Sequence, residues 1–221
     1  MTPVDISLYG LVDPARSNGR DLAELAAAAA KGGATLIQLR DKTAPTRVFV
    51  EEARAIHKAL RGTGVPLLIN DRVDVALAAE AEGVHLGQDD MDARDARRQL
   101  GPEAIIGLTI KNEGHVASAP IGAIDYVAIG GVFETLSKDN PDPPVGTDGL
   151  ARLISQVRAR HAGMPACAIA GITEARIASV IEAGADGVAI ISAIFMADDP
   201  EAAARQLRGT VDDALAKRSG A

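Results

Sequence analysis

Eight short apolar segments recur along this chain of 221 residues, and helical patterns separate them. The segments span residues 6–12, 34–40, 65–70, 83–87, 104–110, 124–130, 165–171 and 186–192. Their apolar residues run continuously rather than alternating with polar ones, which is typical of parallel strands covered on both faces. Eight strand–helix units in a chain of this length predict a (β/α)8 TIM barrel, with residues 1–221 as a single catalytic domain. A doubly wound open sheet is the alternative, but the early GxGxxG loop usual there is absent.

The segments between the expected strands carry helix and turn signals. Phe49, Ala53, Ile56 and Leu60 fall on one stripe at helical spacing, which predicts an amphipathic helix on the outside of the barrel. Glycines at the ends of other helical patterns predict tight turns at the lower rim. The segment 130–146 is the long exception, and it is rich in proline and polar residues. Long loops in compact domains are usually functional, so we expect a loop at the upper rim able to close over a ligand.

Composition excludes several classes of function. Hydrophobic residues make up 47% of the chain, aromatic residues only 2%, and the formal net charge is −7. A chain that is acidic and poor in aromatic side chains is not expected to bind nucleic acid. Its one cysteine, Cys167, lies within an apolar run and is expected to be buried, and one cysteine cannot form an intramolecular disulfide. With no apolar run of about 20 residues and no signal-peptide pattern, we expect no membrane partner and a cytoplasmic location.

Polar and charged side chains follow several of the expected strands at the point where each strand ends. The run LLIND ends in Asp71, the run GVHLGQDD ends in Asp90, and ATLIQLRDK adds Arg40 and Lys42. The carboxyl ends of all strands of a barrel meet at one rim, where active sites of this fold lie. Carboxylates gathered there repel one another unless a cation lies between them, and Mg²⁺ typically takes one or two carboxylates plus substrate phosphates. The sequence therefore predicts a Mg²⁺–phosphate site.

Each of these residues also has a simpler interpretation. Asp71 is a good N-cap residue for the helix that follows it. Arg40 and Asp41 are adjacent and suit a plain surface ion pair. Asp89 is expected to be solvated, whereas its neighbour Asp90 is the candidate metal ligand. His85 is a candidate base, although its place inside a strand favours a position in the interior of the barrel.

Six stretches occur along the chain in this order: QLRDK, IND, GVHLGQDD, GGVFETLSK, AIAGI and GADGVAIISAI. On these stretches the chain resembles the thiamine-phosphate synthase (thiamine-phosphate diphosphorylase) family over nearly its whole length. Asp71, Asp90 and Thr109 follow one another at equal steps of nineteen residues. The resemblance implies a TIM-barrel transferase of thiamine biosynthesis. It would join a hydroxymethylpyrimidine diphosphate to a thiazole phosphate with release of diphosphate, and its cofactor would be Mg²⁺.

The resemblance also assigns residues to the parts of such a site. Mg²⁺ would lie between Asp71 and Asp90. The cations that assist departure of diphosphate would be Arg40, Lys42 and Lys138. The pyrimidine diphosphate would contact Gln38, Leu39, Arg40, Asp41, Lys42, Asn70, Thr109 and Lys138. The thiazole phosphate would contact Thr135, Leu136, Ser137, Gly171, Ile191 and Ser192.

Two departures from the family pattern concern the thiazole phosphate end. Ala170 stands where glycine is usual, which is expected to narrow the room beside Gly171, and Ser137 replaces a common threonine. The sequence leaves three alternatives open on the same barrel. They are a thiazole tautomerase-like relative with His85 or another rim group as base, a non-catalytic binder of thiamine precursors, and a phosphosugar isomerase. The oligomeric state, including a homo-oligomer, is also left open.

Overall fold

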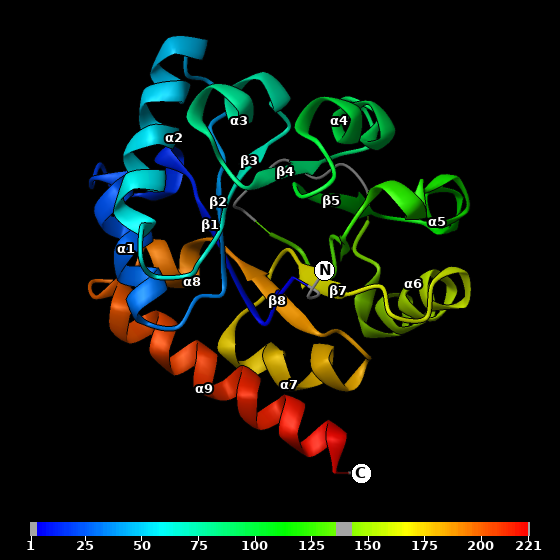
Figure 1. Ribbon diagram of the computed structural model, residues 1–221. Helices are drawn as coiled ribbons and strands as arrows, with labels where there is room; N and C mark the ends of the chain where they lie inside the picture. The colour runs from blue at the N-terminus through cyan, green and yellow to red at the C-terminus, as the bar shows by residue number, and fades with distance from the viewer. Residues whose placement is uncertain (1–3, 136–142, 221) are drawn as a thin grey trace.

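The eight apolar segments form a closed barrel of parallel strands in the computed structural model, which describes residues 4–135 and 143–220 (Figure 1). Neighbouring strands pair in sequence order, and β8 pairs with β1 to close the sheet. The strands are β1 (Leu8–Val12), β2 (Leu36–Leu39), β3 (Leu67–Asn70), β4 (Gly83–Leu86), β5 (Ile105–Ile110), β6 (Tyr126–Ile129), β7 (Ala166–Ile169) and β8 (Gly187–Ile190). All eight predicted strands are confirmed, and closure excludes the open sheet. The strands end before some of the apolar runs do, because the ends of those runs enter the loops.

Helices surround the barrel, as Figure 1 shows. The α-helices are α1 (Leu22–Lys31), α2 (Thr46–Leu60), α3 (Val73–Ala79), α4 (Ala93–Leu100), α5 (Glu113–Ser118), α6 (Gly146–Arg160), α7 (Glu174–Glu182), α8 (Ser192–Phe195) and α9 (Pro200–Ser219). Two 3-10 turns, η1 (Pro14–Arg16) and η2 (Ile121–Ala123), follow β1 and precede β6. The last helix, α9, packs against both α1 and α7. Over the described part of the chain, no helix combines the length and the apolar character needed to cross a membrane.

Local sequence explains where the helices begin and which face they bury. The Asp21 side chain accepts a hydrogen bond from the Glu24 backbone N–H at 2.9 Å and so caps α1, which satisfies one of the unpaired donors of its first turn. In α2, the predicted stripe of Phe49, Ala53, Ile56 and Leu60 is buried, as expected. This apolar face holds the helix against the sheet.

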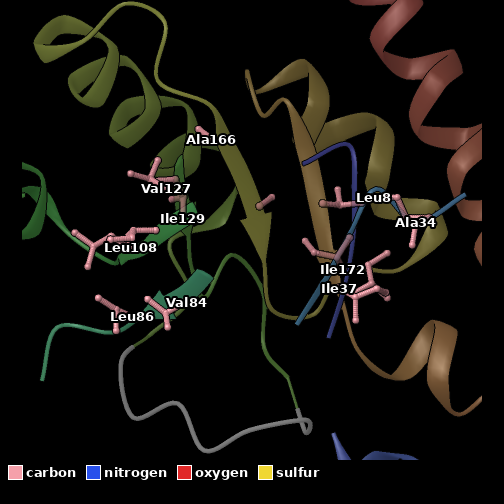
Figure 2. Close-up of a cluster of buried hydrophobic side chains, with 14 of the residues drawn as sticks. Leu8, Ala34, Ile37, Val84, Leu86, Leu108, Val127, Ile129, Ala166 and Ile172 are labelled. Carbon is pink, nitrogen blue, oxygen red and sulfur yellow. The ribbon is translucent and has the colours of Figure 1, made fainter. Parts of the chain in front are cut away.

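The hydrophobic core has two parts, one on each side of the sheet. Outward-facing strand residues pack against the helices, and Figure 2 shows some of them, including Leu8, Val84 and Val127. Inward-facing residues fill the barrel itself, among them Tyr9, Tyr126 and Cys167. Cys167 is buried, as predicted. Because the lower barrel is filled with side chains, a ligand can enter only from a rim.

Candidate active site at the carboxyl rim of the barrel

A cavity of about 460 Å³ lies at the carboxyl ends of the strands, within the size range of small-molecule sites. Eight of the residues that the sequence assigned to substrates line it: Gln38, Arg40, Asn70, Thr109, Thr135, Gly171, Ile191 and Ser192. Leu136, Ser137 and Lys138, also assigned, lie outside the described residues. Leu39, Asp41, Lys42, Asp71 and Asp90 are not in the cavity wall. Residues from both predicted substrate ends thus share one cavity.

Asp71 and Asp90 lie together beside this cavity. The Lys42 ammonium forms an ion pair with the Asp71 carboxylate, and the Asp90 carboxylate accepts a hydrogen bond from the Gly87 backbone N–H at 2.6 Å. Burial raises the pKa of Asp90, and the neighbouring Asp71 carboxyl raises this pKa further, against the opposing effects of Gly87 and Lys42. Two neighbouring carboxyl groups repel each other when both are ionised, so positive charge beside them is stabilising. In this structure Lys42 supplies part of that charge.

The backbone of Asp71 is in the left-handed region, with φ 63°. Few residues other than glycine adopt this conformation, although aspartate tolerates it better than most. The turn is stabilised by a hydrogen bond from the Asp71 backbone N–H to the His85 carbonyl at 2.8 Å. The N-cap of α3 is Arg72 rather than Asp71, so capping does not explain the aspartate. An uncommon backbone conformation beside a cavity is a feature of functional sites.

The carboxylates of Asp71 and Asp90 suit a hard cation for which the protein supplies only some of the ligands. Among residues 4–135 and 143–220, no group of three or more His, Cys, Asp or Glu side chains is placed to hold a metal ion. A structural zinc or calcium cage would need such a group. Two carboxylates suffice for Mg²⁺, which keeps several waters and takes substrate phosphates as further ligands.

Arg40 is held by a residue that the sequence analysis missed. Its guanidinium donates a hydrogen bond to the carboxylate of Asp13, which directly follows β1 and is only 5% exposed. The alternative of an Arg40–Asp41 ion pair is wrong, because the Asp41 carboxylate instead accepts from the backbone N–H groups of Thr43 and Ala44 at 2.7 and 2.8 Å. The sequence shows Asp13 as another acidic residue at a strand end, but it does not show that Asp13 pairs with Arg40, which follows β2. The Leu39 side chain packs in the outer core, which leaves only its backbone for a ligand.

Two buried amide groups face the cavity with unused hydrogen-bonding capacity. Gln38 is 1% exposed and Asn70 is 8% exposed, and both line the cavity. The Gln38 Oε1 and Asn70 Nδ2 atoms have no hydrogen-bond partner among the described residues. Since a buried polar atom without a partner costs free energy, these atoms indicate a polar ligand that supplies a donor to one and an acceptor to the other.

His85 is buried in the interior of the barrel, as predicted. Its Nδ1 lies 2.8 Å from the Tyr126 hydroxyl, and its Nε2 lies 2.8 Å from the Thr109 hydroxyl. Both ring nitrogens are therefore engaged with protein groups. This arrangement suits a positioning role better than that of a base that removes a proton from substrate.

At the other end of the cavity, the loop after β7 passes close to the described part of segment 130–146. Gly171 has φ +66°, and a Cβ there would lie 2.4 Å from the Glu134 carbonyl oxygen, so glycine is required for two reasons. Its neighbour Ala170 has φ 78°, which explains why glycine is usual at that position. The backbone at Ala170 is therefore strained, and the narrowing beside Gly171 stays a prediction. Ser192 begins the short helix α8, as expected.

Segment 130–146 leaves and returns at this rim, as predicted. The Val145 backbone N–H donates to the Gly131 carbonyl at 2.9 Å, and the Val132 N–H donates to the Ile169 carbonyl at 3.0 Å. Two further arginines that the sequence analysis did not single out, Arg16 and Arg176, line the cavity. Neither lies in a motif or at a strand end, so no sequence signal marked them. The closing motion expected of the loop stays a prediction.

Comparisons with known proteins agree on one family. Residues 8–194 match the family described as thiamine monophosphate synthase. The chain is 54% identical to a thiamine-phosphate synthase of Agrobacterium fabrum, with 99% of each chain covered. It is 46% identical to one of Xanthobacter autotrophicus, with 95% of this chain and 97% of the relative covered.

Solved structures give the same result. A thiamine phosphate pyrophosphorylase from Pyrococcus furiosus superposes with a TM-score of 0.82 at 32% identity, covering 96% of this chain and 98% of that one. A Mycobacterium tuberculosis tryptophan synthase superposes with a TM-score of 0.68 at 14% identity, covering 94% of this chain and 93% of that one, and this shows the fold alone. From the family match and the full-length relatives, the chain belongs to the thiamine-phosphate synthase family, a family of transferase enzymes of thiamine biosynthesis.

Proposed function

We propose that this enzyme joins 4-amino-2-methyl-5-(diphosphooxymethyl)pyrimidine to 4-methyl-5-(2-phosphooxyethyl)thiazole, giving thiamine phosphate and diphosphate. The observation that carries the proposal is the pair of carboxylates, Asp71 and Asp90, with Lys42 beside them at one side of a cavity that reaches Gly171 and Ser192. Such a site has groups for a metal-bound diphosphate and room for a second phosphorylated substrate. The names of the relatives support the same reaction class.

The diphosphate end would be held by charge. Asp71 and Asp90 would hold Mg²⁺, which would supply positive charge to the leaving diphosphate. Arg40 lines the cavity and Lys42 lies beside the carboxylates, so both can contact diphosphate oxygens through charge-assisted hydrogen bonds. Lys138 is assigned the same task from the sequence. These groups would stabilise the charge that develops as the carbon–oxygen bond to diphosphate breaks.

The bond-forming step would need positioning more than proton transfer. Departure of diphosphate leaves a pyrimidine-methyl cation, which the electron-rich aminopyrimidine stabilises, and the thiazole nitrogen then attacks its methylene carbon. Gln38 and Asn70 would hold the pyrimidine ring through their unpaired amide atoms. Gly171, Ile191 and Ser192 would hold the thiazole phosphate at the opposite wall. Fixing two reactants in one geometry removes much of the entropic barrier.

The alternatives account for less of the site. A thiazole tautomerase would need one phosphate site and a base, but His85 has both ring nitrogens bonded to protein groups, and the carboxylate pair would have no task. A binder without catalysis would not need cations at a leaving group. A phosphosugar isomerase would leave the carboxylate pair unexplained. The cytoplasmic location and the oligomeric state stay predictions.

The reaction itself tests the proposal. The purified full chain is incubated with both substrates and Mg²⁺, and thiamine phosphate and diphosphate are quantified by mass spectrometry and a coupled phosphate assay. We expect the two products in equal amounts, and EDTA to stop their formation. The Asp90→Asn variant should lose most of the rate, whereas Asp89→Asn, at an exposed neighbouring carboxylate, should keep it. Isomerisation of the thiazole substrate without a coupled product would contradict the proposal.

A further inference from the structure

Two consecutive residues directly after β7 have left-handed backbone conformations. Ala170 has φ 78° and Gly171 has φ 66°, and both residues line the cavity. We call these two residues the β7 turn. Glycine adopts this conformation freely, but alanine does so at a cost in free energy, because its Cβ comes close to the following carbonyl oxygen. With alanine at the first position, contacts from other parts of the chain must hold the β7 turn in its observed shape.

The loop that follows β6 supplies backbone contacts to the first part of this turn. The Val132 N–H donates to the Ile169 carbonyl at 3.0 Å, and the Phe133 N–H donates to the Ala170 carbonyl at 3.2 Å. These two hydrogen bonds fix the chain up to the carbonyl of Ala170. They do not reach the next carbonyl, that of Gly171, so the second half of the β7 turn needs a different contact.

Arg176 makes that contact. Its guanidinium donates a hydrogen bond to the Gly171 carbonyl oxygen at 2.7 Å, and it lies over the Phe133 ring, 4.3 Å from the ring centroid. Among residues 4–135 and 143–220, no other group donates to the Gly171 carbonyl. One side chain therefore connects the second half of the β7 turn to the loop after β6.

The place of Arg176 in its own helix does not explain the residue. Arg176 is exposed and lies in the first turn of α7, which begins at Glu174. The helix dipole favours anions in the first turn and disfavours cations there. The contacts that the guanidinium does make, a charge-assisted hydrogen bond and a cation–π contact, both lie outside the helix. Holding the β7 turn therefore accounts for an arginine at this position, whereas helix stability does not.

We propose that Arg176 is a positioning residue that keeps the β7 turn in the left-handed shape in which it holds the second substrate, and that this chain depends on Arg176 because residue 170 is alanine. Arg176 acts through the turn, and the backbone of Gly171 rather than the arginine contacts the phosphate. The inference rests on the proposed function, which assigns the thiazole phosphate to Gly171. It adds a coupling between Arg176 and Ala170.

The size of the effect follows from the fraction of molecules in which the turn is formed. A ligand that binds only one conformer has its apparent affinity reduced by the fraction of protein in that conformer. Without the Arg176 hydrogen bond, the cost of a left-handed alanine should leave the β7 turn formed in roughly a tenth of the molecules. The KM for the thiazole phosphate should then rise roughly tenfold. The kcat at saturating substrate should stay near that of the wild type, because the bound ligand restores the turn.

A double-mutant cycle between Arg176 and Ala170 tests the inference in the full chain. Arg176→Met removes the donor and the charge but keeps an unbranched side chain against Phe133, and Ala170→Gly removes the conformational cost. Diphosphate release is measured with each substrate varied in turn, which gives a KM for both. We expect Arg176→Met to raise the thiazole phosphate KM roughly tenfold in the Ala170 chain and less than about threefold in the Ala170→Gly chain. The KM for the pyrimidine diphosphate should stay unchanged in both chains.

Phe133→Leu is a second probe, because it removes the aromatic face beneath the guanidinium at a residue that does not line the cavity. It should raise the same KM, but by less than Arg176→Met does. Arg152→Met, at an exposed arginine on α6, is the matched control and should keep both KM values of the wild type. Thermal unfolding shows whether each variant is folded. If Arg176→Met does not fold, Phe133→Leu in the alanine and glycine chains decides the question.

Three outcomes would overturn the inference and leave the proposed function in place. Equal rises in the thiazole phosphate KM in the alanine and glycine chains would mean that Arg176 contacts the phosphate directly. An unchanged KM in folded Arg176→Met would mean that the turn holds without the arginine. Equal rises for both substrates, or the same rise in Arg152→Met, would mean a general effect of charge. A wild type that forms no thiamine phosphate from the two substrates would instead overturn the proposed function, on which the inference rests.

Discussion

Replacing Arg40 by alanine should damage both stability and activity, and the structure gives a separate cause for each. The Arg40 side chain is 18% exposed, and its ion-pair partner Asp13 is 5% exposed. Breaking a buried ion pair from one side costs about 3–5 kcal/mol, and the residual exposure of Arg40 puts the expected loss of stability near the lower value. Loss of one donor to the developing charge of diphosphate costs about 3 kcal/mol of transition-state stabilisation, or roughly a hundredfold in rate.

A second change at Asp13 separates the two effects. Asp13→Asn removes the carboxylate charge but keeps the oxygen that accepts from the Ala15 backbone N–H at 2.9 Å. The double variant Arg40→Ala/Asp13→Asn therefore no longer has a buried charge without a partner. We expect it to recover most of the lost stability and none of the lost rate. Arg47→Ala, at an exposed position on α2, is the control for a general effect of charge.

Urea unfolding measures the stability of each variant, and a continuous assay of diphosphate release at saturating substrates measures its rate. We expect a rate loss of about a hundredfold in both Arg40 variants and a rate close to that of the wild type for Arg47→Ala. Recovery of the wild-type rate in the double variant would mean that Arg40 acts only through Asp13. Equal losses in the Arg40 and Arg47 variants would mean a general charge effect rather than a site.

Three further changes test other parts of the structure. Ala170→Gly should raise the free energy of unfolding by up to about 1 kcal/mol, because glycine adopts φ 78° without strain; an unchanged urea midpoint would contradict this. Ser192→Ala should weaken binding of the thiazole phosphate by roughly tenfold and leave pyrimidine diphosphate binding unchanged in calorimetric titrations. Equal weakening of both ligands would contradict the assignment of Ser192 to the thiazole phosphate. Burial raises the pKa of Cys167 to about 12 from 9.0, so its contribution to stability is complete below pH 9 and is lost as the pH rises toward 12. Cys167→Ala should therefore lose stability less steeply above pH 9 in unfolding measurements, and an identical slope would refute the assignment.

The barrel was predictable from the sequence because its strands are covered on both faces. A continuous apolar run such as LLIND has no solvated face, and eight such runs with helical patterns between them favour one architecture. The site could be located for the same reason. Asp71, Asp90 and Arg40 stand where apolar runs stop, and the carboxyl ends of parallel strands meet at one rim. The resemblance to a known family then added roles that residue types alone do not give.

Contacts across the barrel were not predictable, because they depend on how far each strand is offset from its neighbours. Tyr9 and Tyr126 are 117 positions apart in sequence, and nothing near either residue indicates that their hydroxyls meet. The need for glycine at position 107 becomes clear only when the positions of Tyr126 and His85 are known, because a Cβ there would overlap both side chains. The departure at Ala170 was visible in the sequence, but its physical meaning, a left-handed backbone, was not.

The central claim is that the carboxylate pair binds diphosphate through Mg²⁺, and titration with inorganic diphosphate tests it most directly. Calorimetry is performed on the wild type, Asp90→Asn and Asp89→Asn, each with Mg²⁺ and with EDTA. We expect Mg²⁺ to tighten diphosphate binding at least tenfold, or about 1.4 kcal/mol, in the wild type and in Asp89→Asn. We expect Asp90→Asn to lose most of this gain. Equal affinity with Mg²⁺ and with EDTA in the wild type, or the same gain in Asp90→Asn as in Asp89→Asn, would contradict the account.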